Sequence, residues 1–247
     1  MRNGPVFGRI LLKLSGELLR GAAGSSLDPA AISLVAEQVK DAADHGVQVA
    51  LVIGAGNLFR GLPASRGGMN RCSADNIGML ATVMNALAMR DALEAVGLPT
   101  EIQSAIPMSG IANPFDVRQA LKFLDGGRVV IFAGGTGHPF FSTDTTAALR
   151  ACQVGASAVL KATKVDGVYT ADPKTDPTAV RYRRISYGDA LNQRLNVMDS
   201  TAFSLCMDNN MPILVFNFSQ PSILRNVVQG DLTCATLVDH GPTELDD

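Results

Sequence analysis

The stretch QVALVI, residues 48–53, decides the fold class of this 247-residue chain, because five of its six side chains are apolar without a break. The stretches RILLKL (9–14), RVVIF (128–132) and AVLK (158–161) have the same character. Strands that are apolar on both faces are typical of a parallel sheet covered by helices on each side. We therefore predict an α/β fold, a three-layer α/β/α sandwich around a mostly parallel sheet.

Amphipathic stretches alternate with these runs along the chain. The pair Asp28-Pro29 offers an N-cap followed by proline in the first turn, which predicts a helix that ends at His45-Gly46. Apolar spacing and stop signals predict further helices over 76–96, 116–124, 143–154, 186–195, 199–209 and 221–228, and further strands over 100–104, 212–216 and 235–238. We expect one domain over 1–247, with 1–8 flexible and 166–184 forming a loop or hairpin outside the main sheet.

Composition disfavours several classes of protein. Lys and Arg number 21 and Asp and Glu 23, so the formal net charge of −2 gives no electrostatic footprint for nucleic acid or an anionic membrane. No apolar run approaches the ~20 residues of a membrane span. The spacings of Cys72, Cys152, Cys206 and Cys234 are long and irregular, which predicts neither a metal site nor disulfides. We expect a soluble protein with free thiols in a reducing cytoplasm, and no membrane or nucleic-acid partner.

Candidate ligand-binding residues follow the predicted strands, since open α/β sheets bind ligands at the carboxyl ends of their strands. Lys13 ends the first strand and precedes Ser15 and Gly16, a cation beside exposed backbone N–H groups that suits a phosphate. The loop GAGNLFRG (54–61) follows the second strand, and its Arg60 could fork onto phosphate oxygens. A surface lysine before a turn and a tight glycine turn are the simpler alternatives for these two segments.

A longer glycine-rich segment, GGTGHPFFSTD (134–144), follows the strand 128–132 and opens a helix. Thr143 is placed to cap that helix, whose N-terminus is an anion site, and Asp144 comes next. Lys161 and Lys164 end a later strand, and Tyr169 beyond them could stack on a base. Helix capping alone and a charged hairpin are the simpler alternatives here.

The chain contains no Walker motif G-x-x-x-x-G-K-[ST], which disfavours a P-loop fold. The strand ends offer several cations and one carboxylate instead, without His or Cys ligands. Phosphoryl transfer needs positioning and charge neutralisation more than covalent chemistry, so this set of residues fits a phosphotransferase.

These segments, together with GMNR (68–71), Asp75 and MLATVMN (79–85), resemble the bacterial uridylate kinases of the amino acid kinase family. The resemblance covers nearly the whole chain. It implies an amino acid kinase-like fold and transfer of the γ-phosphoryl of ATP to UMP, which gives UDP in pyrimidine nucleotide biosynthesis, with Mg²⁺ accompanying ATP. It also implies a homohexamer built from dimers through the Met-rich helix, and the effectors GTP and UTP, with 21–26 as the stretch tied to GTP.

The resemblance also assigns roles to single residues. It implies that ATP contacts Lys13, Leu14, Ser15, Gly16, Gly56, Arg60, Thr163, Tyr169 and Asp172. It implies that UMP contacts Ala55, Asp75, Thr136, Gly137, His138, Pro139, Phe140, Phe141, Ser142 and Thr143, with Asp75 on the ribose hydroxyls. The catalytic charges would be those of Lys13, Arg60, Asp144 and the pair Lys161 and Lys164. The protein alone fixes no metal, and Asp144 would orient the lysines, nucleotide-bound magnesium, or both.

Two positions depart from the family pattern: residue 55 is Ala where Gly is usual, and residue 138 is His where Asn is usual. A backbone contact at Ala55 survives a methyl group, whereas the imidazole of His138 cannot present donor and acceptor as an amide does. Two other functions stay open. One is a kinase of the same fold for a carboxylate such as acetylglutamate or aspartate, which Asp75 would repel. The other is a non-catalytic nucleotide sensor, which would not need so many catalytic charges.

Overall fold

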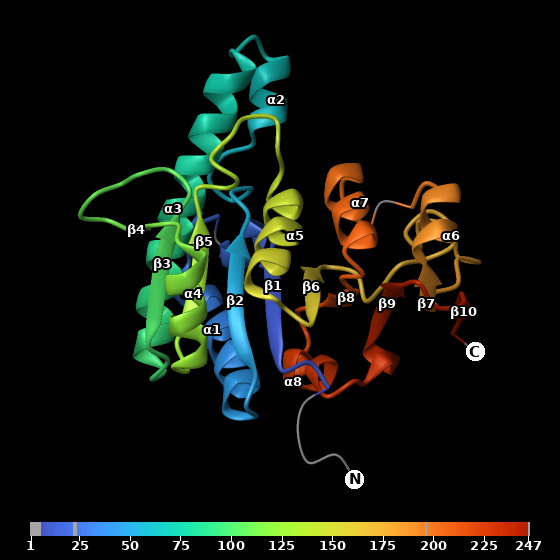
Figure 1. Ribbon diagram of the computed structural model, residues 1–247. Helices are drawn as coiled ribbons and strands as arrows, with labels where there is room; N and C mark the ends of the chain where they lie inside the picture. Colours follow the sequence, from blue (N-terminus) through green and yellow to red (C-terminus); the bar gives the residue numbers. More distant parts are fainter. Residues whose placement is uncertain (1–5, 22–23, 196, 247) are drawn as a thin grey trace.

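The structure is a computed structural model that describes residues 6–21, 24–195 and 197–246. Over these residues one ten-stranded sheet has the order β10-β7-β9-β8-β6-β1-β2-β5-β3-β4, and helices lie on both of its faces (Figure 1). The strands are β1 (Arg9–Leu14), β2 (Gln48–Ile53), β3 (Thr100–Ser104), β4 (Asn113–Pro114), β5 (Val129–Ala133), β6 (Ala158–Thr163), β7 (Tyr182–Ser186), β8 (Ile213–Asn217), β9 (Ala235–Asp239) and β10 (Glu244–Leu245).

The helices between these strands complete the three layers. They are α1 (Pro29–Asp44), α2 (Gly61–Arg66), α3 (Arg71–Ala95), α4 (Val117–Asp125), α5 (Thr143–Val154), α6 (Tyr187–Asn192), α7 (Ser200–Asp208) and α8 (Ile223–Val228), with short 3-10 turns η1 (Gly16–Leu19) and η2 (Leu232–Cys234). The predicted three-layer α/β/α sandwich is confirmed. The described part of the chain contains no helix that is both long and apolar enough to span a membrane.

Most neighbouring strands pair in parallel, as predicted. The run β8-β6-β1-β2-β5-β3-β4 is parallel throughout, whereas β8 pairs with β9 and β7 with β10 in antiparallel fashion. In the parallel run all carboxyl ends point to the same edge of the sheet, which is where such sheets bind ligands. The fold thereby brings the ends of β6, β1, β2 and β5 together.

Alternation along the strands builds a core on each face of the sheet. On β1, Ile10, Leu12 and Leu14 pack in the core beneath α1, α3 and α8, while Leu11 packs in the core beneath α4, α5, α6 and α7. All four side chains are fully buried. Burial of one leucine or isoleucine side chain contributes roughly 1.5–3 kcal/mol, so a strand that is apolar on both faces is stable only between two helix layers.

The predicted boundaries are confirmed where a cap or an apolar run marks them. The Asp28 side chain accepts the backbone N–H of Ala31 at 2.9 Å, and Pro29 opens α1, as predicted. The long helix α3 begins earlier than its predicted start at 76. Asn70 caps it by accepting from Ser73 N–H at 3.1 Å. The apolar stripe does not mark this first turn, because Arg71–Asp75 is mostly polar.

The prediction that 166–184 lies outside the main sheet is wrong at its end. Tyr169 and Arg181 form an antiparallel bridge, as in a hairpin, but β7 starts at Tyr182 and pairs with β9 and β10 within the main sheet. The sequence of β7 has no continuous apolar run, because only Tyr182 and Ile185 in it are buried. The strand was therefore not predicted. The short elements α2, β4, β10, η1 and η2 were also not predicted.

The expectations for domains and chain ends stay predictions. Residues 1–5 of the segment expected to be flexible lie outside the described residues, while Val6 donates its N–H to Val228 O at 2.9 Å. Residues 22 and 23 of the stretch tied to GTP also lie outside them. One continuous sheet supports a single domain. Figure 1 shows α2 and the start of α3 projecting beyond the carboxyl edge of this sheet.

Candidate active site

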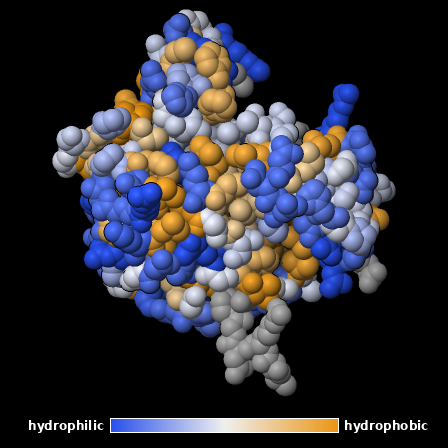
Figure 2. Space-filling view, in the orientation of Figure 1, coloured by the Kyte–Doolittle hydropathy of each residue, from blue (hydrophilic) through white to orange (hydrophobic). Residues whose placement is uncertain are grey.

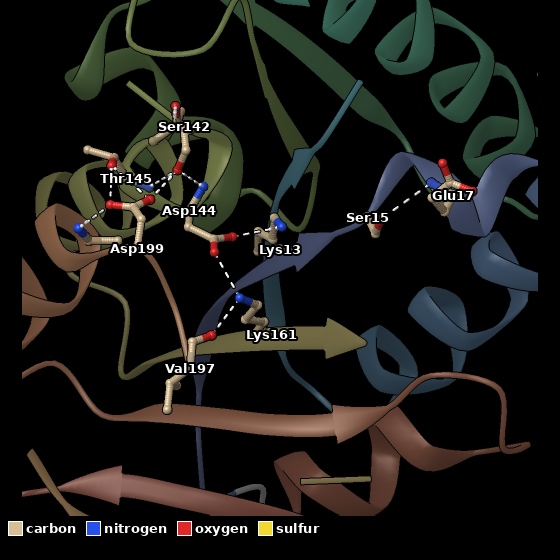
Figure 3. A network of polar contacts seen from close by, with 11 residues as sticks. Lys13, Ser15, Glu17, Ser142, Asp144, Thr145, Lys161, Val197 and Asp199 are labelled. Carbon is tan, nitrogen blue, oxygen red and sulfur yellow. Dashed lines mark hydrogen bonds and ion pairs between the residues drawn. The ribbon is translucent and has the colours of Figure 1, made fainter. Parts of the chain in front are cut away.

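Two lysines stand side by side at the carboxyl edge of the sheet. Lys13 on β1 and Lys161 on β6 are register partners in adjacent parallel strands, so their side chains leave the same face. Asp144, the second residue of α5, lies between them (Figure 3). Its Oδ1 is 2.7 Å from Lys13 Nζ and its Oδ2 is 2.8 Å from Lys161 Nζ. One carboxylate therefore joins both strands to the start of α5.

The environment of this Lys13–Asp144–Lys161 cluster is largely closed to solvent, since its side chains are only 13%, 14% and 16% exposed. Burial pushes the pKa of Asp144 upward, but the charges of Lys13 and Lys161 and the hydrogen bond from Lys161 outweigh burial and hold this pKa below its usual value. Burial lowers the pKa of Lys161, and the attraction of Asp144 opposes that shift. With both lysines protonated, the cluster carries one net positive charge in a sheltered place, which suits a phosphate.

Ser142, and not Thr143, caps α5. The Ser142 hydroxyl accepts the backbone N–H groups of Asp144 at 2.9 Å and Thr145 at 3.1 Å. The predicted cap is therefore wrong by one residue, because either hydroxyl of the Ser-Thr pair could have served. Thr143 is the first residue of α5, and its Oγ1 lies 3.4 Å from where a Cβ on Gly54 would be. The start of α5 thus adjoins the loop after β2.

Asp199 is a residue of this site that the sequence analysis missed. Its carboxylate accepts hydrogen bonds from the hydroxyls of Ser142 and Thr145, the latter at 3.0 Å, and from the backbone N–H of Ala202 at 3.0 Å (Figure 3). Just before it, Val197 O accepts a hydrogen bond from Lys161 Nζ at 2.5 Å. The segment that leads into α7 therefore holds both α5 and Lys161. The predicted helix start at 199 was the only sequence signal, and it indicated a cap rather than this contact.

The turn after β1 packs against the loop after β2 at very short range. A Cβ on Gly16 would lie 2.3 Å from Asn57 Oδ1 and 2.4 Å from Gly54 O, so only glycine fits there. Gly54 also donates its N–H to Leu14 O at 2.9 Å. Ser15, Gly16, Ala55 and Gly56 therefore lie in one region, as the predicted phosphate contacts require.

A reciprocal amide pair fastens this region to α3. Asn57 and Asn85 are both buried, and each donates from Nδ2 to the other's Oδ1 at 2.9 Å. Asn85 also donates to Gly54 O and Asn57 to Ser26 O, both at 2.7 Å. Buried amides with satisfied partners specify a unique arrangement, so the loop after β2 is held in one position. Neither residue has a role that the sequence pattern predicts.

Arg60 pairs with Glu17 rather than with a member of the Lys13–Asp144–Lys161 cluster. Arg60 Nη2 is 2.7 Å from Glu17 Oε1. The hydrogen bond from Arg60 lowers the pKa of Glu17, and the charges of Arg60, Arg20 and Lys164 lower it further. Lys161 is thus the lysine of the pair that contacts Asp144, while Lys164 follows the end of β6 and is exposed.

Asp75 links α3 to the segment before α5. Its Oδ2 accepts hydrogen bonds from Arg71 Nε and from the backbone N–H of Phe140, both at 2.8 Å. The guanidinium of Arg71 lies 5.2 Å from the centre of the Phe140 ring. Phe140 has a φ of +72°, which is rare outside glycine, and this hydrogen bond helps to hold it. Arg71 belonged to a quoted motif but had no predicted role.

The rest of the segment 134–142 curves over the end of β5. Gly134 has a φ of +74°, and a Cβ there would lie 2.9 Å from Ser104 Oγ, so a larger residue would not fit. Thr136 Oγ1 accepts the N–H of His138 at 3.3 Å, which closes a small turn before Pro139. His138, Phe140, Phe141 and Ser142 are exposed. These predicted UMP contacts therefore present accessible side chains, and Phe140 lies beside Asp75.

The predicted ATP contacts after β6 form a separate group along the chain. Thr163 Oγ1 donates to Val165 O at 2.5 Å, and Tyr169 donates its hydroxyl to Asp166 at 2.8 Å. Asp172 accepts the backbone N–H of Lys174 at 3.0 Å in a local turn. These side chains have local partners and make no hydrogen bond or ion pair with Lys13, Asp144 or Lys161 in the described chain.

A metal ion bound beside Asp144 would take its other ligands from substrate phosphates. No group of three or more His, Cys, Asp or Glu side chains that could hold a metal occurs among the residues that the structure describes. Asp144 Oδ1 is buried, and its contact with Lys13 is an ion pair without the alignment of a hydrogen bond. It therefore keeps capacity for one more donor or cation. Mg²⁺ commonly binds one or two carboxylates together with substrate phosphates, and Asp144 fits that pattern.

Comparisons with known proteins identify the family of this chain. The model of the amino acid kinase family matches residues 8–217. A uridylate kinase of Saccharophagus degradans is 55% identical over 90% of each chain, and one of Pseudomonas paraeruginosa is 52% identical over 96% of each chain. The crystal structure of UMP kinase from Bacillus anthracis superposes with a TM-score of 0.94 at 37% identity, covering 98% of this chain and 99% of that one. The chain therefore belongs to the amino acid kinase family.

Proposed function

We propose that this protein is a UMP kinase that transfers the γ-phosphoryl group of ATP to UMP. The observation that carries the proposal is the Lys13–Asp144–Lys161 cluster at the carboxyl edge of the sheet. Two oriented cations can neutralise the charge that spreads over the transferred phosphoryl oxygens. The high identity to uridylate kinases over nearly the full chain supports UMP as the acceptor.

In this proposal one group of residues binds the transferred phosphoryl group and another group binds ATP. Lys13 and Lys161 neutralise the transferring phosphoryl, and Asp144 fixes the positions of their ammonium groups. ATP lies along Ser15, Gly16 and the segment after β6 with Thr163, Tyr169 and Asp172. Arg60, which is paired with Glu17 in the free protein, exchanges that carboxylate for phosphate oxygens when nucleotide binds. Lys164 serves as a second, exposed cation near the same place.

UMP occupies the opposite side, between the loop after β2 and the segment 136–143. Its phosphate contacts Ala55 and Thr143, and its base contacts the residues from Thr136 onward. The ribose hydroxyls bind Asp75 Oδ1, because Oδ2 is already used by Arg71 and Phe140. His138 changes the base contact relative to the family pattern, and the exposed position of its ring supports that assignment.

Magnesium accompanies ATP in this proposal and supplies charge neutralisation for the phosphates. Asp144 is the carboxylate that would approach it. We also propose a homohexamer built from dimers through α3, which the exposed apolar side chains Ile77, Leu80 and Met84 support. The effectors GTP and UTP and a cytoplasmic location, which the four free cysteines support, belong to the same proposal.

The structure bears on the competing functions in different ways. Repulsion between Asp75 and an acidic substrate is the sequence argument against a carboxylate kinase. The ion pair of Asp75 with Arg71 weakens that repulsion. The choice against it therefore depends on the identity to uridylate kinases. A nucleotide sensor would have no need for a buried carboxylate between two lysines, since burial of charged groups is costly.

The direct test is ADP release by the purified protein with ATP and Mg²⁺, measured with UMP, acetylglutamate or aspartate as acceptor. Of the three acceptors, we expect only UMP to be phosphorylated. Turnover with either acidic substrate would identify a carboxylate kinase, and nucleotide binding without turnover would identify a sensor. Either result would contradict the proposal.

The Asp75→Asn variant tests the ribose contact. A site that hydrogen-bonds a hydroxyl discriminates against the analogue that lacks it. We expect a higher KM for UMP and a smaller difference between UMP and dUMP in kcat/KM. The matched control is Arg71→Met, which loosens the same loop contact but keeps the carboxylate, and it should raise both KM values while preserving their ratio. An unchanged UMP/dUMP ratio in Asp75→Asn would mean that Asp75 does not contact the ribose.

The Asp144→Asn variant tests the cluster. We expect kcat to fall roughly 10²-fold or more, because two transition-state cations lose their orientation. We also expect a lower Tm, because Lys13 and Lys161 then repel. A carboxyl with a lowered pKa stabilises the fold above its unfolded-state pKa and loses that effect as pH falls through its folded-state pKa. The Tm difference should therefore be largest near neutral pH and shrink below about pH 4.

The control for that variant is Asp125→Asn, which breaks an exposed ion pair with Arg9 away from the carboxyl edge. It should leave kcat unchanged. Full activity in Asp144→Asn, with or without a change in Tm, would show that Asp144 does not organise the catalytic cations.

A further inference from the structure

A hollow of about 670 Å³ lies between the turn after β3, the segment 136–141, α5 and α7, and it shares Thr136, His138 and Phe141 with the predicted UMP contacts. Its walls are mainly apolar and come from Pro107, Pro114, Phe115, Phe141, Leu149 and Leu205. On this face of the molecule, which carries α4, α5 and α7, hydrophobic surface is interspersed with hydrophilic residues (Figure 2). No Asp or Glu is among the residues that line the hollow.

Arg150 lines the same hollow and is the unusual residue in it. Its relative exposure is 4%. Nη1 donates to Gln153 Oε1 at 2.8 Å, while Nε is buried and has no hydrogen-bond partner among the described residues. Arg150 forms no ion pair with any carboxylate in the described chain. A buried guanidinium that meets only a neutral amide is rare, because buried charges are normally paired.

Aromatic stacking accounts for only part of this arrangement. The Arg150 guanidinium lies 3.5 Å from the centre of the Phe115 ring and 5.9 Å from that of Phe132. These contacts hold the group flat against the wall but neutralise no charge. Burial lowers the pKa of Arg150 to about 10, which is the effect of desolvation without a compensating anion. The guanidinium edge thus has unused donors beside an apolar hollow.

We propose that this hollow is a binding site for a small carboxylate with a flat, apolar body, such as an aromatic acid, and that Arg150 pairs with its carboxylate. A guanidinium matches a carboxylate with two parallel hydrogen bonds. One cation with no lysine in the lining suits a monoanion better than a phosphate dianion. The aromatic and proline side chains of Phe115, Phe141 and Pro107 suit the face of a ring.

A ligand bound in the hollow would affect the segment that is predicted to bind UMP. Thr136, His138 and Phe141 line the hollow, and the backbone N–H of Phe140 in the same segment donates to Asp75. A ligand in the hollow would contact these three lining residues, which are also predicted UMP contacts, and this regulatory role rests on the proposed function. The binding itself needs no turnover, so its test is independent of the UMP kinase assay.

The test is calorimetric titration of the full-length protein with benzoate, and with benzamide as its neutral isostere. We expect saturable binding of benzoate and binding of benzamide weaker by about tenfold or more, since a charged hydrogen-bonded pair is lost. Acetate, which has the charge without the ring, should not bind at the same concentrations. No saturable binding of benzoate, or equal binding of benzamide, would overturn the proposal.

Three variants locate the site. Arg150→Met should abolish the preference for benzoate over benzamide. Thr201→Trp changes an exposed residue at the rim of the hollow, so it should fold and block benzoate even if Arg150→Met does not fold. Lys13→Met should leave benzoate binding intact. Loss of binding in Lys13→Met, or unchanged binding in Thr201→Trp, would place benzoate elsewhere and overturn the proposal.

Discussion

A single carboxylate between two lysines is the interaction on which the site depends. The parallel pairing of β1 and β6 fixes Lys13 and Lys161 on strands about 4.8 Å apart, where two ammonium groups repel. Asp144 relieves that repulsion and ties both strands to the first turn of α5. Removal of one partner from a buried ion cluster leaves an uncompensated charge. The cluster therefore stabilises the carboxyl edge of the sheet and also presents the charge that the proposed phosphoryl transfer requires.

Close packing of small residues supplies the precision that this chemistry needs. Gly16 fits against Gly54 because it has no Cβ, and the buried Asn57–Asn85 pair anchors that loop to α3. Asp199 joins the start of α5 to the start of α7. Catalysis by positioning loses efficiency with small displacements, so rigid supports of this kind matter as much as the charges themselves. The segment 138–142 is more exposed, and Asp75 and Asp199 fasten it through Phe140 and Ser142.

The parts of this structure that the sequence predicts are those encoded by local pattern. Strands such as 9–14 and 48–53 are marked by apolar runs, and Asp28 and Pro29 mark the start of α1. Each member of the Lys13–Asp144–Lys161 cluster was a candidate because the two lysines lie at strand ends and Asp144 lies in the segment that follows one. Lys161 and Lys164 could not be told apart, since the choice depends on β6 ending at Thr163. Contacts between distant segments, such as Asp199 with α5 or Arg60 with Glu17, leave no local pattern.

The central claim is that Asp144 acts through the lysines it holds, and a double-mutant cycle measures this directly. The kcat for UMP phosphorylation at saturating ATP and Mg²⁺ would be determined for the wild type, Lys13→Met, Asp144→Asn and the double variant. Each single change should lower kcat by roughly 10²-fold or more, and the double variant should lose far less than the product of the two, because Lys13 without Asp144 is already misplaced. Losses that multiply independently would contradict the account.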